Sequence, residues 1–191
     1  MVTASQVRVG MAVRYEGQVY KVLAADYHPG QGKMGGVMHA RLKNLATGSL
    51  WEHSFRSDLK LEELSVEKQP MDFLYADGEQ CHFMNPDTFE QVDLPASVIG
   101  PQANFLLPDM RVAVEFVEGQ PVSVALPDIL EVRVAETAPP AHQQQESVWK
   151  PAHLDNGVEV MVPQFIKVGD LIRLDVANLK YIDRAKGATK G

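Results

Sequence analysis

The chain has 191 residues, of which 45% are hydrophobic and 23% are charged, and its formal net charge is −7. This composition excludes a disordered chain and suits one globular domain or a few small ones. No apolar run approaches the ~20 residues of a membrane span, and Arg8 and Arg14 precede any long apolar stretch, so we expect neither a membrane protein nor a signal peptide. Cys81 is the single cysteine and has no disulfide partner in the chain. We therefore expect a protein of a reducing compartment, most simply the cytoplasm.

Alternation of apolar and polar residues predicts β-strands along nearly the whole chain. Three strand pairs surround short turn signals, which are Glu16-Gly17, Asp77-Gly78 and Glu118-Gly119. The Asp-Gly signal is strong because this dipeptide favours a type I′ turn. Further elements are expected at residues 158–163 and 171–176 (strands) and at residues 55–64 and 94–100 (weak helical candidates).

Two similar strand patterns lie near opposite ends of the chain, at residues 7–15 and 166–174. Each places an apolar-basic-Val-Gly string before an apolar-Arg-apolar strand, which favours several small barrels over one large sheet. Convergence of β-hairpins on similar strings is the alternative. Two stretches are typical of domain boundaries. One is the charged stretch at residues 64–70, which ends in proline, and the other is the Pro- and Gln-rich segment at residues 135–147. The predicted fold is all-β, with three small barrels at residues 1–65, 66–132 and 133–191.

The acidic charge of the chain is concentrated in the middle segment. Residues 1–65 have a net charge of +2, residues 66–132 of −10 and residues 133–191 of +1. The two outer segments could therefore approach an anionic surface such as RNA, whereas the middle segment would be repelled unless it faces protein or solvent. A merely solvated acidic face is the simpler interpretation of the middle segment.

The stretch HPGQGKMGG, residues 28–36, contains a formal G-x-G-x-x-G motif at Gly30, Gly32 and Gly35. A phosphate-binding loop of this kind needs a strand before it and a helix after it, because the helix N-terminus binds the phosphate. The residues after Gly36 instead alternate at period two, which indicates a returning strand. A Walker A loop would also need Ser or Thr after its lysine, and this chain has Met34 there.

We interpret the same stretch as the tip of a long β-hairpin. Its glycines permit positive φ angles and a close approach of the backbone to a partner, and Pro29 stiffens the entry to the loop. Lys33 would then lie near the apex, and it is the one side chain of the loop that combines a long reach with a fixed positive charge.

Side chains with catalytic or metal-binding chemistry are scattered. The six histidines are His28, His39, His53, His82, His142 and His153. Cys81-His82 has no second pair at ligand spacing, and no Ser-His-Asp arrangement has local support. Cys81 is expected to be a buried strand residue. We predict no metal and no cofactor, and the residues by themselves make an enzyme an unpromising interpretation while leaving a triad assembled in space open. Trp51 and Trp149 could stack on bases, although such residues are more often core or interface aromatics.

Several motifs resemble those of one known family. PGQGK followed by RLKNLATG resembles the hairpin of bacterial elongation factor P, and FMNPDTFEQV and PVSVALPDILEVRVAETAPP resemble its central domain. The C-terminal region is similar to the family string N-G-x-x-x-x-V-P-x-F-I-x-x-G-D, here from Asn156 to Asp170. The resemblance covers essentially the whole chain. It implies an SH3-like, KOW-type N-terminal barrel followed by two OB-fold barrels, in a monomeric translation factor that is not an enzyme.

The resemblance also implies partners and site residues. The family binds the 70S ribosome between the peptidyl and exit sites, where it meets ribosomal RNA and proteins and the peptidyl or initiator transfer RNA, and it helps peptide bonds form through consecutive prolines. The hairpin tip reaches toward the acceptor end of the peptidyl transfer RNA and comprises here Pro29, Gly30, Gln31, Gly32, Lys33, Met34 and Gly35. The apex is often modified, so Lys33 is a candidate modification site and a lysine-modifying enzyme a candidate partner. Tyr181 and Arg184 match a Tyr/Arg pair that the family uses near the small subunit and the transfer RNA.

Two departures from the family pattern affect these assignments. The usual apex is P-G-K-G or P-G-R-G, so alignment on Pro29 would place Gln31 at the tip. Alignment on the returning strand RLKNL places Lys33 there, and we prefer it because strand pairing decides which residue lies at the tip. The central-domain loop of the family commonly has the sequence G-D-N-A, whereas this chain has Gly100, Pro101, Gln102 and Ala103. These four residues form a candidate exit-site loop, and its contact with the codon is left open.

The alternative function is that of a general single-strand RNA-binding protein with OB folds and no specificity for the ribosome. An enzyme built from small barrels is less favoured, because the sequence has no pocket signature.

Overall fold

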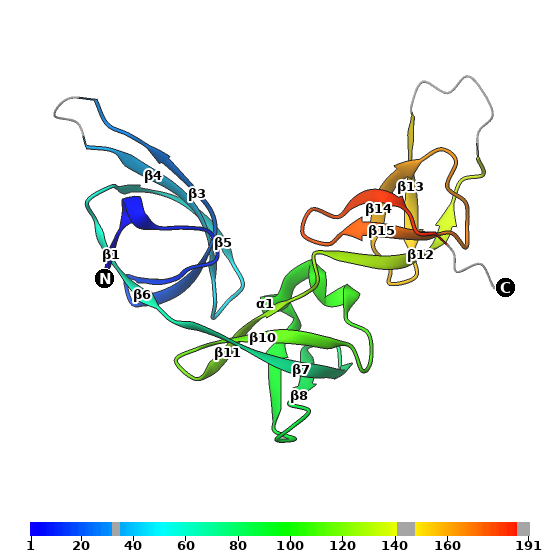
Figure 1. Cartoon of the computed structure of the whole chain (residues 1–191), viewed down its shortest axis with the longest axis horizontal. Coiled ribbons are helices and arrows are strands. Elements are labelled where there is room, and N and C mark those ends of the chain that lie inside the picture. Colours follow the sequence, from blue (N-terminus) through cyan, green and yellow to red (C-terminus); the bar gives the residue numbers. More distant parts are fainter. Residues whose placement is uncertain (32–34, 141–147, 187–191) are drawn as a thin grey trace. The chain divides into compact units, whose positions relative to one another are not determined.

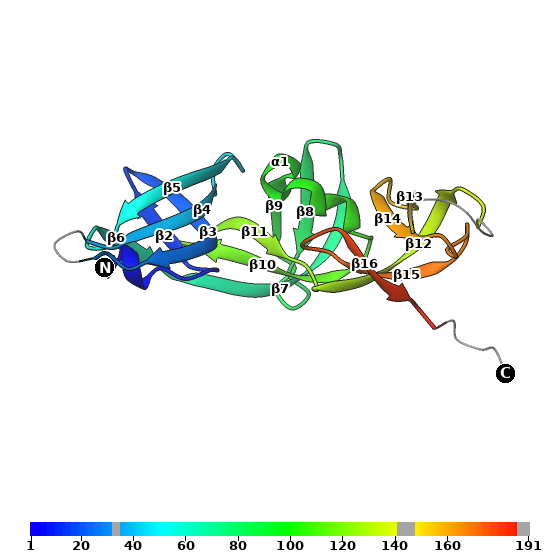
Figure 2. The ribbon, with the colours of Figure 1, turned by 90° about the horizontal axis from the view of Figure 1, so that it is seen from above.

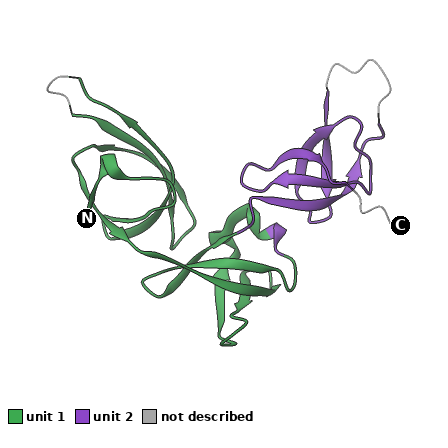
Figure 3. Cartoon of the chain, viewed as in Figure 1, with its two compact units in different colours: residues 1–103, 107–125 green, residues 104–106, 126–191 purple. Residues whose placement is uncertain are grey.

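The computed structural model describes residues 1–31, 35–140 and 148–186. Its strands form three sheets, one of six strands and two of five. The chain divides into two compact units (Figure 3), one comprising Met1–Ala103 and Leu107–Ala125 and the other Asn104–Leu106 and Leu126–Gly191. The predicted all-β class is confirmed.

The first sheet has the strand order β1-β6-β2-β3-β4-β5, and every neighbouring pair is antiparallel. Its strands are β1 (Val2–Thr3), β2 (Ala12–Tyr15), β3 (Gln18–His28), β4 (Val37–Asn44), β5 (Leu50–Arg56) and β6 (Lys60–Leu64). A short 3-10 helix, η1 (Ala4–Gln6), follows β1. Side chains at alternate positions, such as Val13, Val22 and Leu42, point into a common core and are fully buried.

The second sheet has the order β11-β10-β7-β8-β9. Its strands are β7 (Val66–Ala76), β8 (Gln80–Met84), β9 (Gln91–Pro95), β10 (Arg111–Val117) and β11 (Gln120–Ala125). Ser65 alone separates β6 from β7, so the chain passes directly from the first sheet into the second (Figure 2). One helical turn, α1 (Ala96–Ile99), follows β9 and leads into the 3-10 helix η2 (Gly100–Phe105).

The third sheet has the order β14-β13-β12-β15-β16. Its strands are β12 (Ile129–Thr137), β13 (Trp149–Leu154), β14 (Glu159–Pro163), β15 (Leu171–Asp175) and β16 (Lys180–Arg184). Its core contains Ile166, Ile172 and Leu174, and Phe105 from η2 packs into the same core. The proposed domain limits stay predictions; position 132 lies inside β12.

Two of the turns have the type I′ geometry that suits a twisted hairpin. Glu16 and Gly17 have φ angles of 49° and 77°, and Glu118 and Gly119 have φ angles of 51° and 77°. The type I′ expectation for Asp77-Gly78 is wrong. Gly78 has a positive φ angle of 98°, but Asp77 does not have one. Its carboxylate Oδ1 instead accepts hydrogen bonds from the backbone N–H groups of Glu79 and Gln80. The Asp77 N–H donates to the Gln80 carbonyl oxygen at 3.1 Å, so the two residues at the turn are Gly78 and Glu79.

The helical candidate at residues 94–100 is confirmed as α1, but the candidate at residues 55–64 is wrong. That stretch ends β5, turns at Ser57 and Asp58, and continues as β6. Pairing with two strands overrides the local pattern there, since β6 lies between β1 and β2.

The first and second sheets contact each other through both charged and apolar side chains. Lys21 Nζ on β3 lies 2.5 Å from Glu115 Oε1 on β10, and the Glu115 side chain is only 3% exposed. Arg14 Nη2 lies 2.6 Å from Glu118 Oε2. A small apolar cluster of Ala12, Leu45 and Val117 lies beside these pairs. Part of the acidity of the middle segment therefore faces basic residues of the first sheet rather than solvent.

Candidate functional site

Strands β3 and β4 form a long antiparallel hairpin. They pair from Tyr20 opposite Asn44 to His28 opposite Val37, with a register shift that leaves Leu23 as one extra residue. This β-bulge marks a change in environment, because β3 buries Val22 just before it and exposes most side chains after it. Past the bulge β3 is therefore mostly exposed (Figure 1), although its partner strand β4 still contributes Ala40 and Met38 to the core of the first sheet.

The base of the hairpin loop is held on both sides. Val37 pairs with His28 on one side and with Arg56 of β5 on the other. The ring of Tyr27 covers Gly36, where an added Cβ would lie 2.5 Å from the Tyr27 hydroxyl oxygen. The strands that enter and leave the loop are thus fixed by pairing, and a Cβ added at Gly36 would displace the exposed ring of Tyr27.

The predicted tip residues lie only partly within the described chain. Pro29, Gly30, Gln31 and Gly35 are exposed. Gly32, Lys33 and Met34 lie outside the described residues. A strand, β4, follows the loop at Val37, which confirms the expected returning strand and excludes the helix that a nucleotide-binding loop would need.

An aromatic ladder on β5 was missed by the sequence argument. Trp51, His53 and Phe55 occupy alternate positions of the strand, with ring centroids 4.4 Å apart for Trp51–His53 and 4.6 Å apart for His53–Phe55. Tyr15 of β2 contacts all three rings at 5.2 to 5.9 Å. Trp51 also packs against the core of the first sheet, as expected of a core aromatic. The alternation of aromatic residues in LWEHSF is the signal that could have revealed this ladder.

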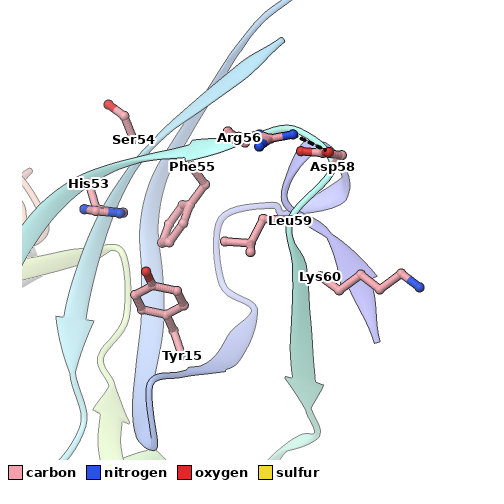
Figure 4. Close-up of a pocket in the computed structure, with 8 residues that line it drawn as sticks. All are labelled: Tyr15, His53, Ser54, Phe55, Arg56, Asp58, Leu59 and Lys60. Carbon is pink, nitrogen blue, oxygen red and sulfur yellow. Dashed lines mark hydrogen bonds and ion pairs between the residues drawn. The ribbon is translucent and has the colours of Figure 1, made fainter. Parts of the chain in front are cut away.

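The ladder ends at a pocket of about 470 Å³ in the first sheet (Figure 4). Tyr15, His53 and Phe55 form one wall, and Leu59 lies opposite them. The segment from Arg56 to Lys60 borders the pocket, with Arg56 Nη2 2.8 Å from Asp58 Oδ2. The pocket therefore combines flat aromatic walls with charged side chains at its edge.

Tyr181 and Arg184 both lie on β16. The Tyr181 ring packs against the core of the third sheet, 6.2 Å from the ring of Trp149, and burial raises the pKa of its hydroxyl. Tyr181 pairs with Leu174 and Arg184 with Ile172, so a bulge at Ile182 puts the two residues on the same face although they are three apart. This bulge brings the predicted pair together, which period-two alternation alone would not do.

Arg184 borders a hollow of about 580 Å³ in the same unit. Arg133 and Lys186 also line it, and among the described residues 148–186 the carboxylate that lines it is that of Asp170, whose Oδ2 lies 3.9 Å from Arg184 Nη1. Arg133 Nη1 donates a hydrogen bond to the carbonyl oxygen of Gly169 at 2.8 Å. With three cations and one carboxylate, this surface favours anions.

The candidate exit-site loop coincides with η2. Gly100 has φ 81° and ψ −156°, a conformation that is essentially restricted to glycine. Pro101 is exposed, whereas Gln102 and Ala103 are half-buried. The loop is therefore a fixed turn after α1, and its half-buried residues have limited surface to offer a partner.

The histidine and cysteine side chains of the second sheet have structural surroundings. His82 lies between two carboxylates, with Nδ1 2.6 Å from Asp93 Oδ1 and Nε2 3.0 Å from Asp77 Oδ2. These bonds raise the pKa of His82, and hydrogen bonds from backbone N–H groups and from His82 lower the pKa of Asp77 to about 2. Cys81 is buried, as expected, and burial raises the pKa of its thiol.

Among residues 1–31, 35–140 and 148–186, no three His, Cys, Asp or Glu side chains gather as a metal ion would require. Within the same residues, no helix has the length and apolarity needed to span a bilayer.

Three family models match successive parts of the chain. Residues 3–61 match the "Elongation factor P (EF-P) KOW-like domain", residues 66–124 the "Elongation factor P (EF-P) OB domain", and residues 130–184 "Elongation factor P, C-terminal". These matches confirm the expected KOW-type barrel and the OB fold that follows it.

Curated relatives match over nearly the full length. A protein named elongation factor P from Acidobacterium capsulatum is 37% identical over 185 residues, which cover 96% of this chain and 99% of the relative. Elongation factor P from Rhizorhabdus wittichii is 38% identical, with 96% and 98% covered, and that from Thermotoga maritima is 36% identical, with 97% and 100% covered. Identity and coverage at this level establish common descent, and the chain therefore belongs to the elongation factor P family of translation factors.

Proposed function

We propose that this factor binds the ribosome between the peptidyl and exit sites and there positions the peptidyl transfer RNA, so that peptide bonds form through consecutive prolines. The observation that carries the proposal is the β3–β4 hairpin, which stays paired out to His28 and Val37, well beyond the buried part of β3. A paired hairpin can hold a side chain far from the body of the protein. It would act in the cytoplasm and as a monomer.

The pairing supports Lys33 rather than Gln31 as the working residue. The eight residues 29–36 connect His28 to Val37, and the middle of that stretch falls between Gly32 and Lys33. Gln31 is nearer to the entry side and has no charge. A cation at the apex would attract the phosphates of the transfer RNA, and this attraction weakens with salt. Lys33 is also the side chain that we propose as the target of a lysine-modifying enzyme.

The proposed mechanism is positional and not enzymatic. Proline reacts slowly because its ring restricts the geometry of attack. Holding the acceptor end of the peptidyl transfer RNA in place lowers the entropic part of the barrier, and orientation effects of this kind can contribute several kcal/mol. The factor needs no nucleophile, general base or cofactor for this role.

The test is a reconstituted translation assay that compares a Pro-Pro-Pro message with a proline-free message. Lys33→Ala should abolish the stimulation of the Pro-Pro-Pro message and retain most ribosome binding, whereas Gln31→Ala, the matched control in the same loop, should stay active. An inactive Gln31→Ala variant beside an active Lys33→Ala variant would show that the other register is right. Intact mass spectrometry of the protein from its native host would report any added group on Lys33.

A second contact is proposed at Arg184. Arg184→Glu replaces attraction to phosphate by repulsion, so ribosome affinity should fall about tenfold at physiological salt without loss of folding. Co-sedimentation with ribosomes measures this, and single-stranded RNA of equal length is the comparison. Equal binding to ribosomes and to the free RNA would favour the general RNA-binding alternative. Arg173→Glu is the control, because Arg173 lies on the neighbouring strand but forms a bidentate pair with Asp183.

A further inference from the structure

We propose that the pocket of the first sheet, here called the aromatic pocket and bordered by Tyr15, His53, Phe55, Arg56 and Lys60, binds one unpaired RNA nucleotide (Figure 4). The base would stack on the aromatic wall and its phosphate would meet the cations at the edge. The proposal rests on the proposed function for the presence of RNA, but it concerns a surface other than the hairpin tip.

The aromatic wall is suited to a base because its rings are already held in place. His53 stacks on Trp51 with an interplanar angle of 29°, and Phe55 meets His53 edge-on at 65°. Tyr15 closes the group from β2, with its ring 5.2 Å from that of Phe55. A preorganised aromatic face loses little conformational entropy when a flat ligand stacks on it. Phe55 is buried, while Tyr15 and His53 are half-buried and can still offer surface to a ligand.

The charges at the edge select a ligand that carries phosphate. The Arg56 side chain is 84% exposed, and Lys60 is exposed as well. Asp58 takes one hydrogen bond from Arg56, and a guanidinium has five donors, so several remain for another partner. Aromatic grooves also bind proline-rich peptides, but a neutral peptide would make no use of the surplus positive charge that Arg56 and Lys60 leave at the edge after Asp58 is counted.

The size of the pocket favours an unpaired nucleotide. Its volume of about 470 Å³ lies within the ~300–1,000 Å³ range of small-molecule sites. That space accommodates a base with its sugar and excludes a duplex, whose bases are stacked and paired. Sequence-tolerant recognition of single strands commonly combines such stacking with a basic edge.

The position of the pocket connects it to the hairpin. Arg56 pairs with Val37, which pairs with His28, so the edge of the pocket lies in register with the base of the hairpin loop. The Ser57 N–H also donates to the Gly36 carbonyl at 2.8 Å. RNA that approaches the hairpin therefore passes the edge of this pocket.

Trp51 provides a direct readout, because its ring stacks on His53 at the wall of the pocket. The protein would carry Trp149→Phe, so that Trp51 is its one tryptophan. Triadenylate RNA, triproline and inorganic pyrophosphate would be titrated at low salt. Saturable quenching by triadenylate alone is the expected result. Quenching by triproline at equal or lower concentration would overturn the proposal in favour of a peptide site. Equal quenching by pyrophosphate, which has no base, would also overturn it, because the site would then bind phosphate without stacking a base.

Two variants test the two halves of the site. His53→Ala removes a stacking face and should weaken triadenylate binding about tenfold. Arg56→Glu, at a side chain too exposed to affect folding, should weaken it by a similar factor and flatten its salt dependence. The matched control is Arg41→Glu on β4, whose exposed side chain does not border the pocket, and its affinity should change by less than about twofold.

The outcome is separable from that of the proposed function. Unchanged triadenylate affinity in both His53→Ala and Arg56→Glu, with Lys33→Ala still inactive on the Pro-Pro-Pro message, would overturn the pocket and leave the proposed function standing. Loss of triadenylate binding in these variants, with a Lys33→Ala protein that is fully active, would support the pocket and overturn the proposed role of Lys33. Thermal unfolding of each variant confirms that it is folded.

Discussion

Strands β3 and β7 are both 11 residues long and both contain one β-bulge, yet they lead to opposite results. In β3 the bulge at Leu23 is followed by five residues, which are mostly exposed although they pair with the core strand β4. In β7 the bulge falls at Leu74 and only two residues follow it before the turn at Asp77. The buried side chains of β7, Met71 and Phe73, lie just before its bulge.

The comparison shows that a bulge by itself does not produce an exposed segment such as residues 24–28 of β3, here called the arm. Both bulges interrupt the alternation and change the direction of the strand. What differs is the chain beyond them. β7 ends at a turn that is tied down by Asp77 and His82, whereas β3 continues in register with β4, whose Met38 and Ala40 pack into the core. The exposed side chains of β3 past its bulge can therefore change at low cost in stability.

The largest expected effect separates the two strands by stability. Phe73→Ala should lower the free energy of unfolding by about 3–5 kcal/mol, because Phe73 is buried against Phe83 with ring centroids 5.5 Å apart. Tyr27→Ala on the arm should lower it by less than about 1 kcal/mol, because Tyr27 is 43% exposed. Urea unfolding monitored by circular dichroism measures both. Equal losses would mean that the arm carries as much of the stability as the core strand.

The next effect concerns the part of β3 that precedes its bulge. Lys21→Met leaves the buried Glu115 without its closest cation, so the free energy of unfolding should fall by about 1–3 kcal/mol. Lys43, whose pKa is lowered by burial and then by the nearby charge of Lys21, remains as a weaker neighbour of Glu115. The control on the arm is Asp26→Ala, whose partner His28 is exposed. A loss as large in Asp26→Ala as in Lys21→Met would contradict a division of β3 at the bulge.

The smallest effect is a pH dependence of the turn that ends β7. The pKa of His82 is raised in the folded protein, so its bonds to Asp77 and Asp93 stabilise fully below the unfolded value of about 6.5, and this contribution is lost as the pH rises through the folded value. Asp77 has a lowered pKa of about 2, so its contribution is present above the unfolded value near pH 4 and lost as the pH falls toward about 2.

The bonds of His82 with Asp77 and Asp93 should therefore stabilise the second sheet most between about pH 4 and pH 6.5. Melting temperatures at pH 6 and pH 9 and low ionic strength report the loss on the alkaline side. His82→Asn should remove the difference, and a His153→Asn control, in the third sheet, should retain it. An unchanged difference in His82→Asn would assign the pH dependence to other groups.

Much of the architecture was predictable from local sequence patterns. Period-two alternation indicated the strands and the all-β class, and the Glu-Gly signals marked two hairpin turns. The returning strand after Gly36 could be predicted for the same reason, since alternation identifies the two faces of a strand wherever it is regular. The buried position of Cys81 and the core role of Trp51 also followed from their places in such strands.

Only the tertiary structure decided the features that depend on pairing with distant residues. Bulges at Leu23 and Ile182 shift the register by one residue, and the second of them places Tyr181 and Arg184 on one face. The aromatic pocket needs Tyr15 from β2 beside β5, and the core of the third sheet takes in Phe105 from η2. Alternation in one strand specifies which side chains share a face, but the partner strand and its packing determine where that alternation is broken and what lies opposite.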